Sequence, residues 1–295
     1  MDVMSGPDTV RSSRQDDRPR LAVPAPAESD NVLSVPRKPG SAAGAGYRLL
    51  ADLLYRACYG KFGIAGARKL RGRLVHRFPP VARVVYRVRY GKFGTALADA
   101  VPVPGFLDWG ESLALADVCH ELPANAVIVE IGSFLGKSAV VLAGARKLRG
   151  SGIVHCVDPF DASGDAFSMP FYRAIADADV LPLRQRFDAH ITRAGLTDWV
   201  RAHRGTAASI AAGWIEPIDM LFLDGDQSPE GARLAYDSWA PFLKAGAIVA
   251  LHNSSERTYD PGHDGHHLLA LHVVRPPQYA SIRCVDSTTF GRKLN

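Results

Sequence analysis

The stretch at residues 126–138, with the sequence AVIVEIGSFLGKS, constrains the fold of this chain more than any other. Its β-branched run from Val127 to Ile131 is typical of a buried parallel strand. Gly132 ends this run, and a helical pattern follows a few residues later. A strand, a glycine turn and a helix in this order open several nucleotide-binding folds. The chain is therefore expected to build a parallel sheet with a ligand site beside this turn.

The spacing of the small residues separates the candidate ligands of the turn. A dinucleotide site needs G-x-G-x-x-G, but Phe134 stands where the second glycine would be. A P-loop needs G-x-x-x-x-G-K-[ST], and residues 136–138 supply only its end, because Ile131 stands in place of the first glycine. What remains is an acid-x-Gly-x-x-x-Gly pattern that starts at Glu130. This pattern suits an adenosyl group that carries a sulfonium and no phosphate.

These motifs resemble those of the class I S-adenosylmethionine-dependent methyltransferases. The match is to their small-molecule O-methyltransferase-like subgroup, with V-E-I-G-x-x-x-G-x-S and a later strand that ends in D-G-D. The resemblance runs from about Trp109 to the C-terminus. It implies an α/β, Rossmann-like methyltransferase fold: a doubly wound, seven-stranded, mostly parallel sheet with a terminal antiparallel hairpin. The alternative for the two glycines alone is an ordinary strand-to-helix turn in another α/β protein.

Strand and helix patterns alternate along the rest of the chain, which predicts a doubly wound parallel sheet. The strands expected after the first are at 153–157, 200–203, 218–223 and 246–251, and the expected hairpin pairs 280–285 with 288–293. In such a sheet, ligands bind beyond the carboxyl ends of the strands. Residues far apart in the sequence should therefore converge on one crevice.

The resemblance implies that S-adenosylmethionine occupies this crevice. The residues expected to bind it are Glu130, Gly132, Gly136, Ser138, Asp158, Gly205 and Thr206. Asp158 ends the second strand, where a carboxylate can accept hydrogen bonds from both ribose hydroxyls. The alternative for Asp158 is a helix N-cap before the proline that follows it.

Methyl transfer is an in-line displacement, so catalysis needs positioning and, for a hydroxyl acceptor, a base. His252, at the end of the fifth strand, is the histidine predicted as that base, although a structural role is the alternative; Asp226 is the second predicted catalytic residue. Metal-dependent members of the family imply that Asp224 and Asn253 hold a divalent cation such as Mg²⁺. The sequence departs from that pattern, because Gln227 stands where a histidine often follows D-G-D and Asn253 stands where H-D would be common.

The net charge of +5 hides an asymmetry along the chain. Residues 56–92 hold eleven Lys or Arg and no acid, whereas residues 95–295 hold 17 Lys or Arg against 23 Asp or Glu. We expect a disordered arm at 1–45, a helical basic accessory segment at 46–108 and the methyltransferase domain at 109–295. The basic segment is predicted to recruit an anionic partner, such as a membrane surface or a phosphorylated carrier. Solvated helices are the alternative.

The function that these features favour is O-methylation of a hydroxylated small molecule, such as a sugar or a secondary metabolite. A nucleic-acid methyltransferase that uses the basic segment is an alternative, because aromatic residues are interleaved with its charges. A non-enzymatic nucleotide-binding or P-loop-like module is another. No apolar run approaches the length of a membrane span, and no secretory signal pattern opens the sequence, so a cytoplasmic location is expected.

Overall fold

The computed structural model describes residues 79–295 of the chain. The expected arm at 1–45 and residues 46–78 of the expected basic segment lie outside the described residues. None of the helices in the described part is long and apolar enough to cross a membrane.

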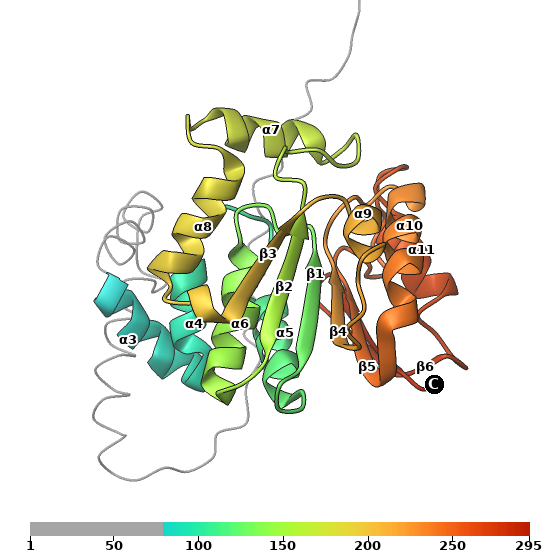
Figure 1. Ribbon diagram of the computed structural model, residues 1–295, viewed down its shortest axis with the longest axis horizontal. Helices are drawn as coiled ribbons and strands as arrows, with labels where there is room; N and C mark the ends of the chain where they lie inside the picture. Colours follow the sequence, from blue (N-terminus) through green and yellow to red (C-terminus); the bar gives the residue numbers. More distant parts are fainter. Residues whose placement is uncertain (1–78) are drawn as a thin grey trace, which may run out of the picture. The chain divides into compact units, whose positions relative to one another are not determined.

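One seven-stranded sheet organises the described residues (Figure 1). Its strands, in the spatial order β3-β2-β1-β4-β5-β7-β6, are β1 Val127–Ile131, β2 Ile153–Asp158, β3 Val200–Arg204, β4 Ile218–Leu223, β5 Leu243–Leu251, β6 Tyr279–Val285 and β7 Thr288–Lys293. The strands β1 to β5 pair in parallel, and β7 pairs antiparallel with both β5 and β6. This arrangement confirms the predicted mostly parallel sheet with a terminal hairpin. The strand order reverses between β1 and β4, where open α/β sheets bind their ligands.

Helices cover both faces of the sheet. They are α3 Pro79–Tyr90, α4 Gly94–Ala100, α5 Trp109–Glu121, α6 Lys137–Arg149, α7 Met169–Asp177, α8 Leu183–Arg193, α9 Ala207–Ala211, α10 Pro229–Trp239 and α11 Gly265–His272, with short 3₁₀ turns at Gly91–Phe93, Thr197–Trp199 and Ala240–Phe242. In Figure 1, α4, α5, α6 and α8 lie on one face, α9, α10 and α11 lie on the other, and α7 lies beyond the carboxyl ends of β1 and β2. The sheet is therefore covered on both sides, which is why its central strands are buried on both faces.

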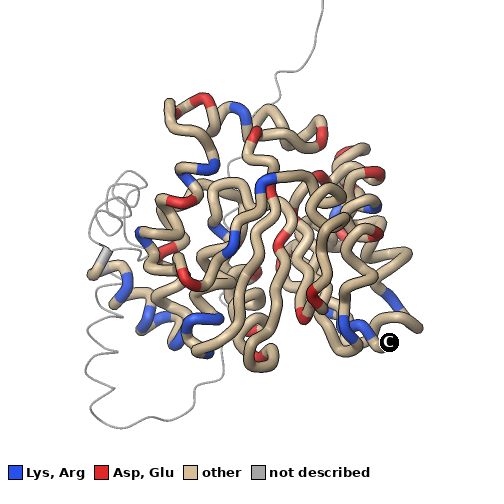
Figure 2. The backbone as a smooth tube through the Cα atoms, viewed as in Figure 1, with Lys and Arg blue, Asp and Glu red and all other residues tan. Residues whose placement is uncertain are grey.

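The described end of the basic segment packs on the sheet. In α3 and the turn after it, Val85, Tyr86 and Phe93 are buried in the same hydrophobic core as α5 and α6. Figure 2 shows arginines along α3, and one of them, Arg83, forms an ion pair of 2.7 Å with Asp99 of α4. An acid near the C-terminal end of the same segment thus pairs with one of its arginines. The predicted boundaries of the three segments stay predictions.

Candidate active site

The turn after β1 is fixed by its contact with the turn after β4. Gly132 has φ +88, and a Cβ atom at this position would lie 2.4 Å from the Cα of Gly225 and 2.5 Å from the carbonyl oxygen of Asp224. The Asp224 amide donates to the Ile131 carbonyl at 2.8 Å, so the ends of the two strands are held together. Only glycine combines this left-handed backbone with so close an approach. Gly136, with φ +89, then begins α6.

Asp158 supports this turn from the end of β2. Its carboxylate accepts hydrogen bonds from the amides of Phe134, at 2.8 Å, and Phe160, at 2.6 Å. Its carbonyl accepts from Gly205 at 3.1 Å, and the hydroxyl of Thr206 accepts from the Ser209 amide at the start of α9. The predicted cofactor residues at the ends of β1, β2 and β3 thus lie together. Their contacts hold the backbone of the crevice, and their roles toward the cofactor stay predictions.

Glu130 is the unusual group of the site. Its side chain is fully buried, and neither carboxylate oxygen has a hydrogen-bond partner among the described residues. Burial raises its pKa to about 7, although Ser133, Ser138 and Cys156 nearby act in the opposite direction. A buried carboxylate without a partner is costly and calls for a compensating cation. The residues present therefore fit a cofactor that carries an ammonium and a sulfonium, as S-adenosylmethionine does.

The pKa of Glu130 leads to a prediction about stability. Because the folded-state pKa of about 7 lies above the usual value of 4.5, the unfolded chain loses this proton first as pH rises. The wild-type protein without cofactor should therefore lose stability between about pH 4.5 and 7, by up to about 3 kcal/mol. Glu130→Gln should remove this pH-dependent loss of stability. Denaturant unfolding across this pH range tests it, and parallel stability curves for the two proteins would contradict it.

A small cavity adjoins the glycine turn. Its volume is about 30 Å³, about enough for one water molecule. It is lined by Pro104, Gly105, Phe106, Leu107, Gly132, Ser133, Phe134, Lys137, Ser138, Tyr172 and Asp224. Lys137 holds the segment before α5 over the turn, because its Nζ donates to the Gly105 carbonyl at 3.0 Å.

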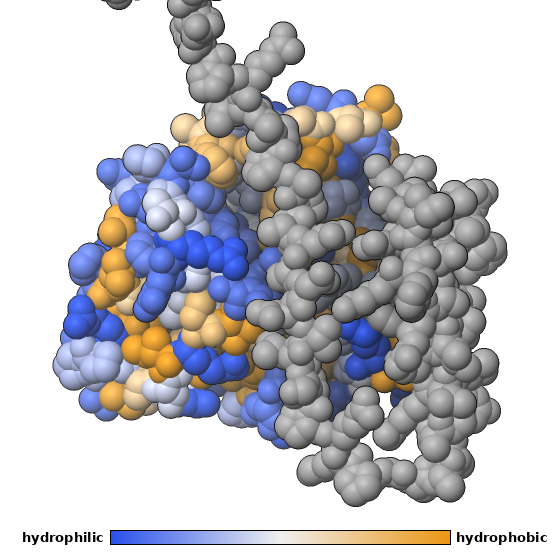
Figure 3. Space-filling model, turned by 180° about the vertical axis from the view of Figure 1, so that it is seen from behind, coloured by the Kyte–Doolittle hydropathy of each residue, from blue (hydrophilic) through white to orange (hydrophobic). Residues whose placement is uncertain are grey.

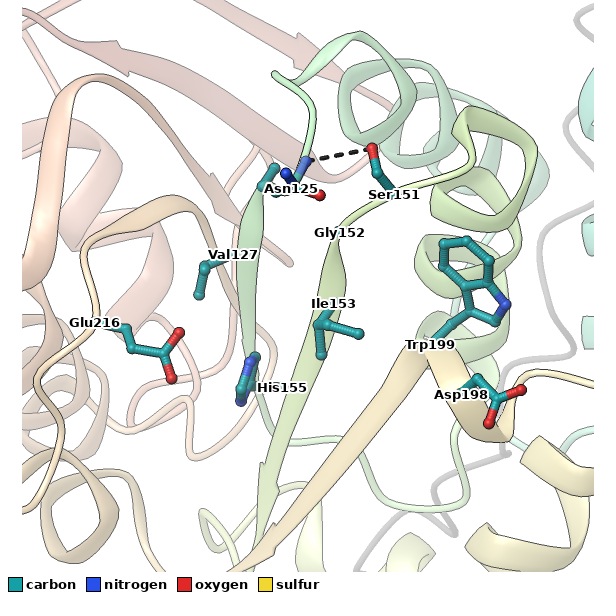
Figure 4. A pocket seen from close by; sticks show the side chains of 10 residues that line it. Asn125, Val127, Ser151, Gly152, Ile153, His155, Asp198, Trp199 and Glu216 are labelled. Atoms are coloured by element: carbon teal, nitrogen blue, oxygen red, sulfur yellow. Dashed lines mark hydrogen bonds between the residues drawn. The ribbon is translucent and has the colours of Figure 1, made fainter.

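A larger cavity, of about 400 Å³, lies at the opposite edge of the sheet (Figure 4). Its lining includes Val127 and Ile153, the first residues of β1 and β2. Figure 4 also shows the hydrogen bond from the Asn125 amide to the Ser151 hydroxyl, 3.2 Å long, in the turns before those strands. Parallel sheets bind their ligands at the carboxyl ends of the strands, so this cavity is not the candidate active site.

His252 lies between two carboxylates at the end of β5. Its Nδ1 is 2.5 Å from Oδ1 of Asp224, and its Nε2 is 3.6 Å from Oε2 of Glu111. Burial would lower the pKa of His252, but the two carboxylates raise it well above its usual value. Burial would also raise the pKa of Glu111, but His252 and the Ser287 hydroxyl lower it to about 2. The predicted role of His252 as a base stays a prediction, and both of its ring nitrogens are already engaged.

The residues predicted to hold a metal do not form a fitting ligand set. Asp224 faces His252, and the side-chain amide of Asn253 donates to Oε1 of Gln227 at 3.2 Å. Asp226 is exposed, and its carboxylate accepts from the Ser228 amide at the start of α10. Within residues 79–295, no group of three or more His, Cys, Asp or Glu is arranged to hold a metal ion. The side chains at Asp224 and Asn253 therefore do not fit the predicted divalent cation.

A second histidine–carboxylate pair, not predicted from the sequence, lies nearby. His263, in the loop before α11, places Nδ1 3.1 Å from Oδ1 of Asp165, in the loop after β2. The Ser168 hydroxyl donates to the other oxygen of Asp165 at 2.8 Å, and the Gln227 amide, next to the D-G-D motif, donates to it at 3.3 Å. Three loops beyond the strand ends thus meet at Asp165.

Comparison with known proteins adds the decisive observation. Residues 129–254 match a family model described as a methyltransferase domain. This range begins in β1 and ends just after β5, so it contains the glycine turn, Asp158, the D-G-D motif and His252. The chain therefore contains a methyltransferase domain.

Solved structures of low sequence identity resemble this methyltransferase. The cofactor-bound protein Rv0187 from MTB is 15% identical, with a TM-score of 0.50 over 69% of this chain and 90% of that chain. The O-methyltransferase TomG from Streptomyces achromogenes, in complex with SAM, is 18% identical, with a TM-score of 0.49 over 68% of this chain and 90% of that chain. The likeness to the MTB protein shows a shared fold.

Proposed function

We propose that this methyltransferase transfers the methyl group of S-adenosylmethionine to a hydroxyl oxygen of a small molecule, such as a sugar or a secondary metabolite. The observation that carries the cofactor assignment is the buried, unpartnered carboxylate of Glu130 beside the Gly132 turn. The hydroxyl acceptor is supported by two histidine–carboxylate pairs at the same edge, His252 with Asp224 and His263 with Asp165. A hydroxyl acceptor loses its proton as it is methylated, and a general base can take that proton.

The residues of the chain contribute mainly by position. When bound, S-adenosylmethionine supplies an electrophilic methyl group on its sulfonium. Glu130 would hold the positive charge of the cofactor, and Asp158 would keep the glycine turn in place through the Phe134 amide or bind the ribose. Asp224 would face the acceptor from the end of β4, as part of the small cavity. Catalysis of this type depends on alignment more than on covalent chemistry.

Calorimetry with S-adenosylhomocysteine and with ATP tests the cofactor assignment. We expect S-adenosylhomocysteine to bind and ATP to bind poorly, because Ile131 stands where a P-loop has the glycine that shapes its phosphate cradle. Tight binding of ATP without binding of S-adenosylhomocysteine would overturn the assignment. Once cofactor binding is established, the formation of S-adenosylhomocysteine in the presence of sugars, phenols or amines would identify the acceptor class. Turnover of amines alone would contradict the proposed hydroxyl acceptor.

The proposal also includes the predicted partner and cellular location of the protein. An anionic partner for residues 56–92 is one of them, and residues 79–92 of that segment are described. Among those, the buried side chains face the core, and Arg83 is paired with Asp99. A nucleic-acid acceptor gains no support from the described residues. A cytoplasmic location completes the proposed setting.

A further inference from the structure

His252 and His263 differ in the one property that a general base needs, a free nitrogen lone pair. Both ring nitrogens of His252 face carboxylates, Asp224 and Glu111. In His263, only Nδ1 is engaged, by Asp165 and by the Ser168 hydroxyl at 3.3 Å. No described residue forms a hydrogen bond with Nε2 of His263. A carboxylate on Nδ1 fixes the tautomer that leaves Nε2 as an acceptor.

The carboxylate that holds His263 is itself rigidly placed. Asp165 is 3% exposed and accepts hydrogen bonds from the amides of Phe167, at 3.1 Å, and Ser168, at 2.9 Å. Burial would raise the pKa of Asp165, but hydrogen bonds from His263 and Ser168 lower it below its usual value. An ionised carboxylate on Nδ1 would also stabilise the positive charge that forms when Nε2 takes a proton.

Aromatic side chains lie exposed around this pair. The ring of Phe167 is 4.5 Å from the ring of His263 and 5.8 Å from that of Phe171, and the ring of Phe106 is 5.9 Å from that of Tyr172, which lines the small cavity. Phe106, Phe167 and Phe171 are each more than 40% exposed, and α7 buries none of its residues. Figure 3 shows hydrophobic residues at the upper edge of the molecule, where α7 lies. Exposed aromatic residues beside a cavity suit an acceptor with a planar apolar part.

We propose that His263 is the catalytic residue that takes the proton of the acceptor hydroxyl, and that Asp165 is its positioning residue. This inference rests on the proposed function. The acceptor oxygen forms a bond to the methyl carbon, the carbon–sulfur bond breaks with its electron pair left on sulfur, and the hydroxyl proton passes to Nε2 of His263. The products are the methyl ether, S-adenosylhomocysteine and an imidazolium that returns its proton to solvent.

The test uses the full chain saturated with S-adenosylhomocysteine and 4-nitrophenol as a probe, since its ionised form absorbs visible light. At a pH where free 4-nitrophenol is mostly neutral, the bound probe should be ionised by wild-type protein. His263→Gln should lose this visible band, and Asp165→Asn should weaken it. His267→Gln is the matched control and should keep the band, because His267 lies four residues later, in α11, and its Nδ1 is 3.4 Å from the Ser254 carbonyl oxygen.

The outcomes separate this inference from the proposed function. Calorimetry on the same samples first measures the binding of S-adenosylhomocysteine. Thermal unfolding then establishes that each variant is folded. Without cofactor binding, the proposed function fails, and this inference fails with it. With cofactor binding, a bound probe that stays neutral, an unbound probe, or an equal visible band in folded His263→Gln would overturn the role of His263 alone.

Discussion

Arg146→Met is expected to lower the free energy of unfolding by about 3–5 kcal/mol. Arg146 is fully buried near the end of α6. Its guanidinium donates to four backbone carbonyls, those of Cys119 at 2.7 Å, Leu122 at 3.3 Å, Pro123 at 2.8 Å and Ser151 at 2.8 Å. Methionine would fill much of the volume but leave these oxygens without donors. The cost arises because buried carbonyls cannot recover their hydrogen bonds from water.

The matched control is Arg149→Met, three residues later in the same helix. Arg149 is exposed in the last turn of the same helix, so its replacement should change the unfolding free energy by about 0.5 kcal/mol or less. Denaturant unfolding of the two variants and the wild type measures the difference. Similar midpoints for all three proteins would show that the carbonyls find other partners and that Arg146 does not stabilise the fold.

Arg146 also illustrates what the sequence does not reveal about packing. The octamer AGARKLRG at residues 143–150 occurs also at 65–72, and nothing in the sequence distinguishes its arginines. In the structure the first of them is buried and joins the end of α5 to the turn before β2, whereas the second is exposed. The copy at 65–72 lies outside the described residues. Helical periodicity predicts α6 but not which of its cations meets unpaired carbonyls.

The sheet could be predicted because its signals are local. Buried β-branched runs and glycine turns mark β1 to β4 almost to the residue. β5 begins at Leu243, three residues before the predicted Gly246, and its register with β4 shifts between Ile218 and Met220. The irregularity depends on how β5 pairs with β4, and the local sequence pattern of one strand does not predict this pairing.

The candidate site was predictable only where it coincides with strand ends. His252 was singled out because it ends a strand. Its contact with Glu111, 141 positions earlier in the sequence, depends on the packing of α5 beside the β6–β7 turn. The D-x-x-E pattern that starts at Asp108 marks a capping box and a helix start, not that contact. Asp165 and His263 lie in irregular loops, where no periodicity indicates which side chains meet.

Gly132→Ala is expected to be the most damaging single substitution in the glycine turn. The new Cβ would lie 2.4 Å from the Cα of Gly225, and this neighbour is backbone that cannot rotate away. The left-handed φ of +88 adds strain of about 1–2 kcal/mol for a residue with a side chain. Together with overpacking, the expected loss of unfolding free energy is about 3–5 kcal/mol. Binding of S-adenosylhomocysteine should weaken by about 100-fold, because the ends of β1 and β4 must separate.

Gly150→Ala separates the strain from the clash. Gly150 has a nearly identical φ of +84 at the end of α6, but no atom lies within 4 Å of the position that a Cβ would take. Alanine there should cost only the strain, about 1–2 kcal/mol, and leave cofactor binding unchanged. Calorimetric titration of both variants with S-adenosylhomocysteine, alongside denaturant unfolding, measures the two effects. Equal losses in the two variants would mean that backbone strain alone accounts for Gly132, and that the close approach of the two turns does not shape the cofactor site.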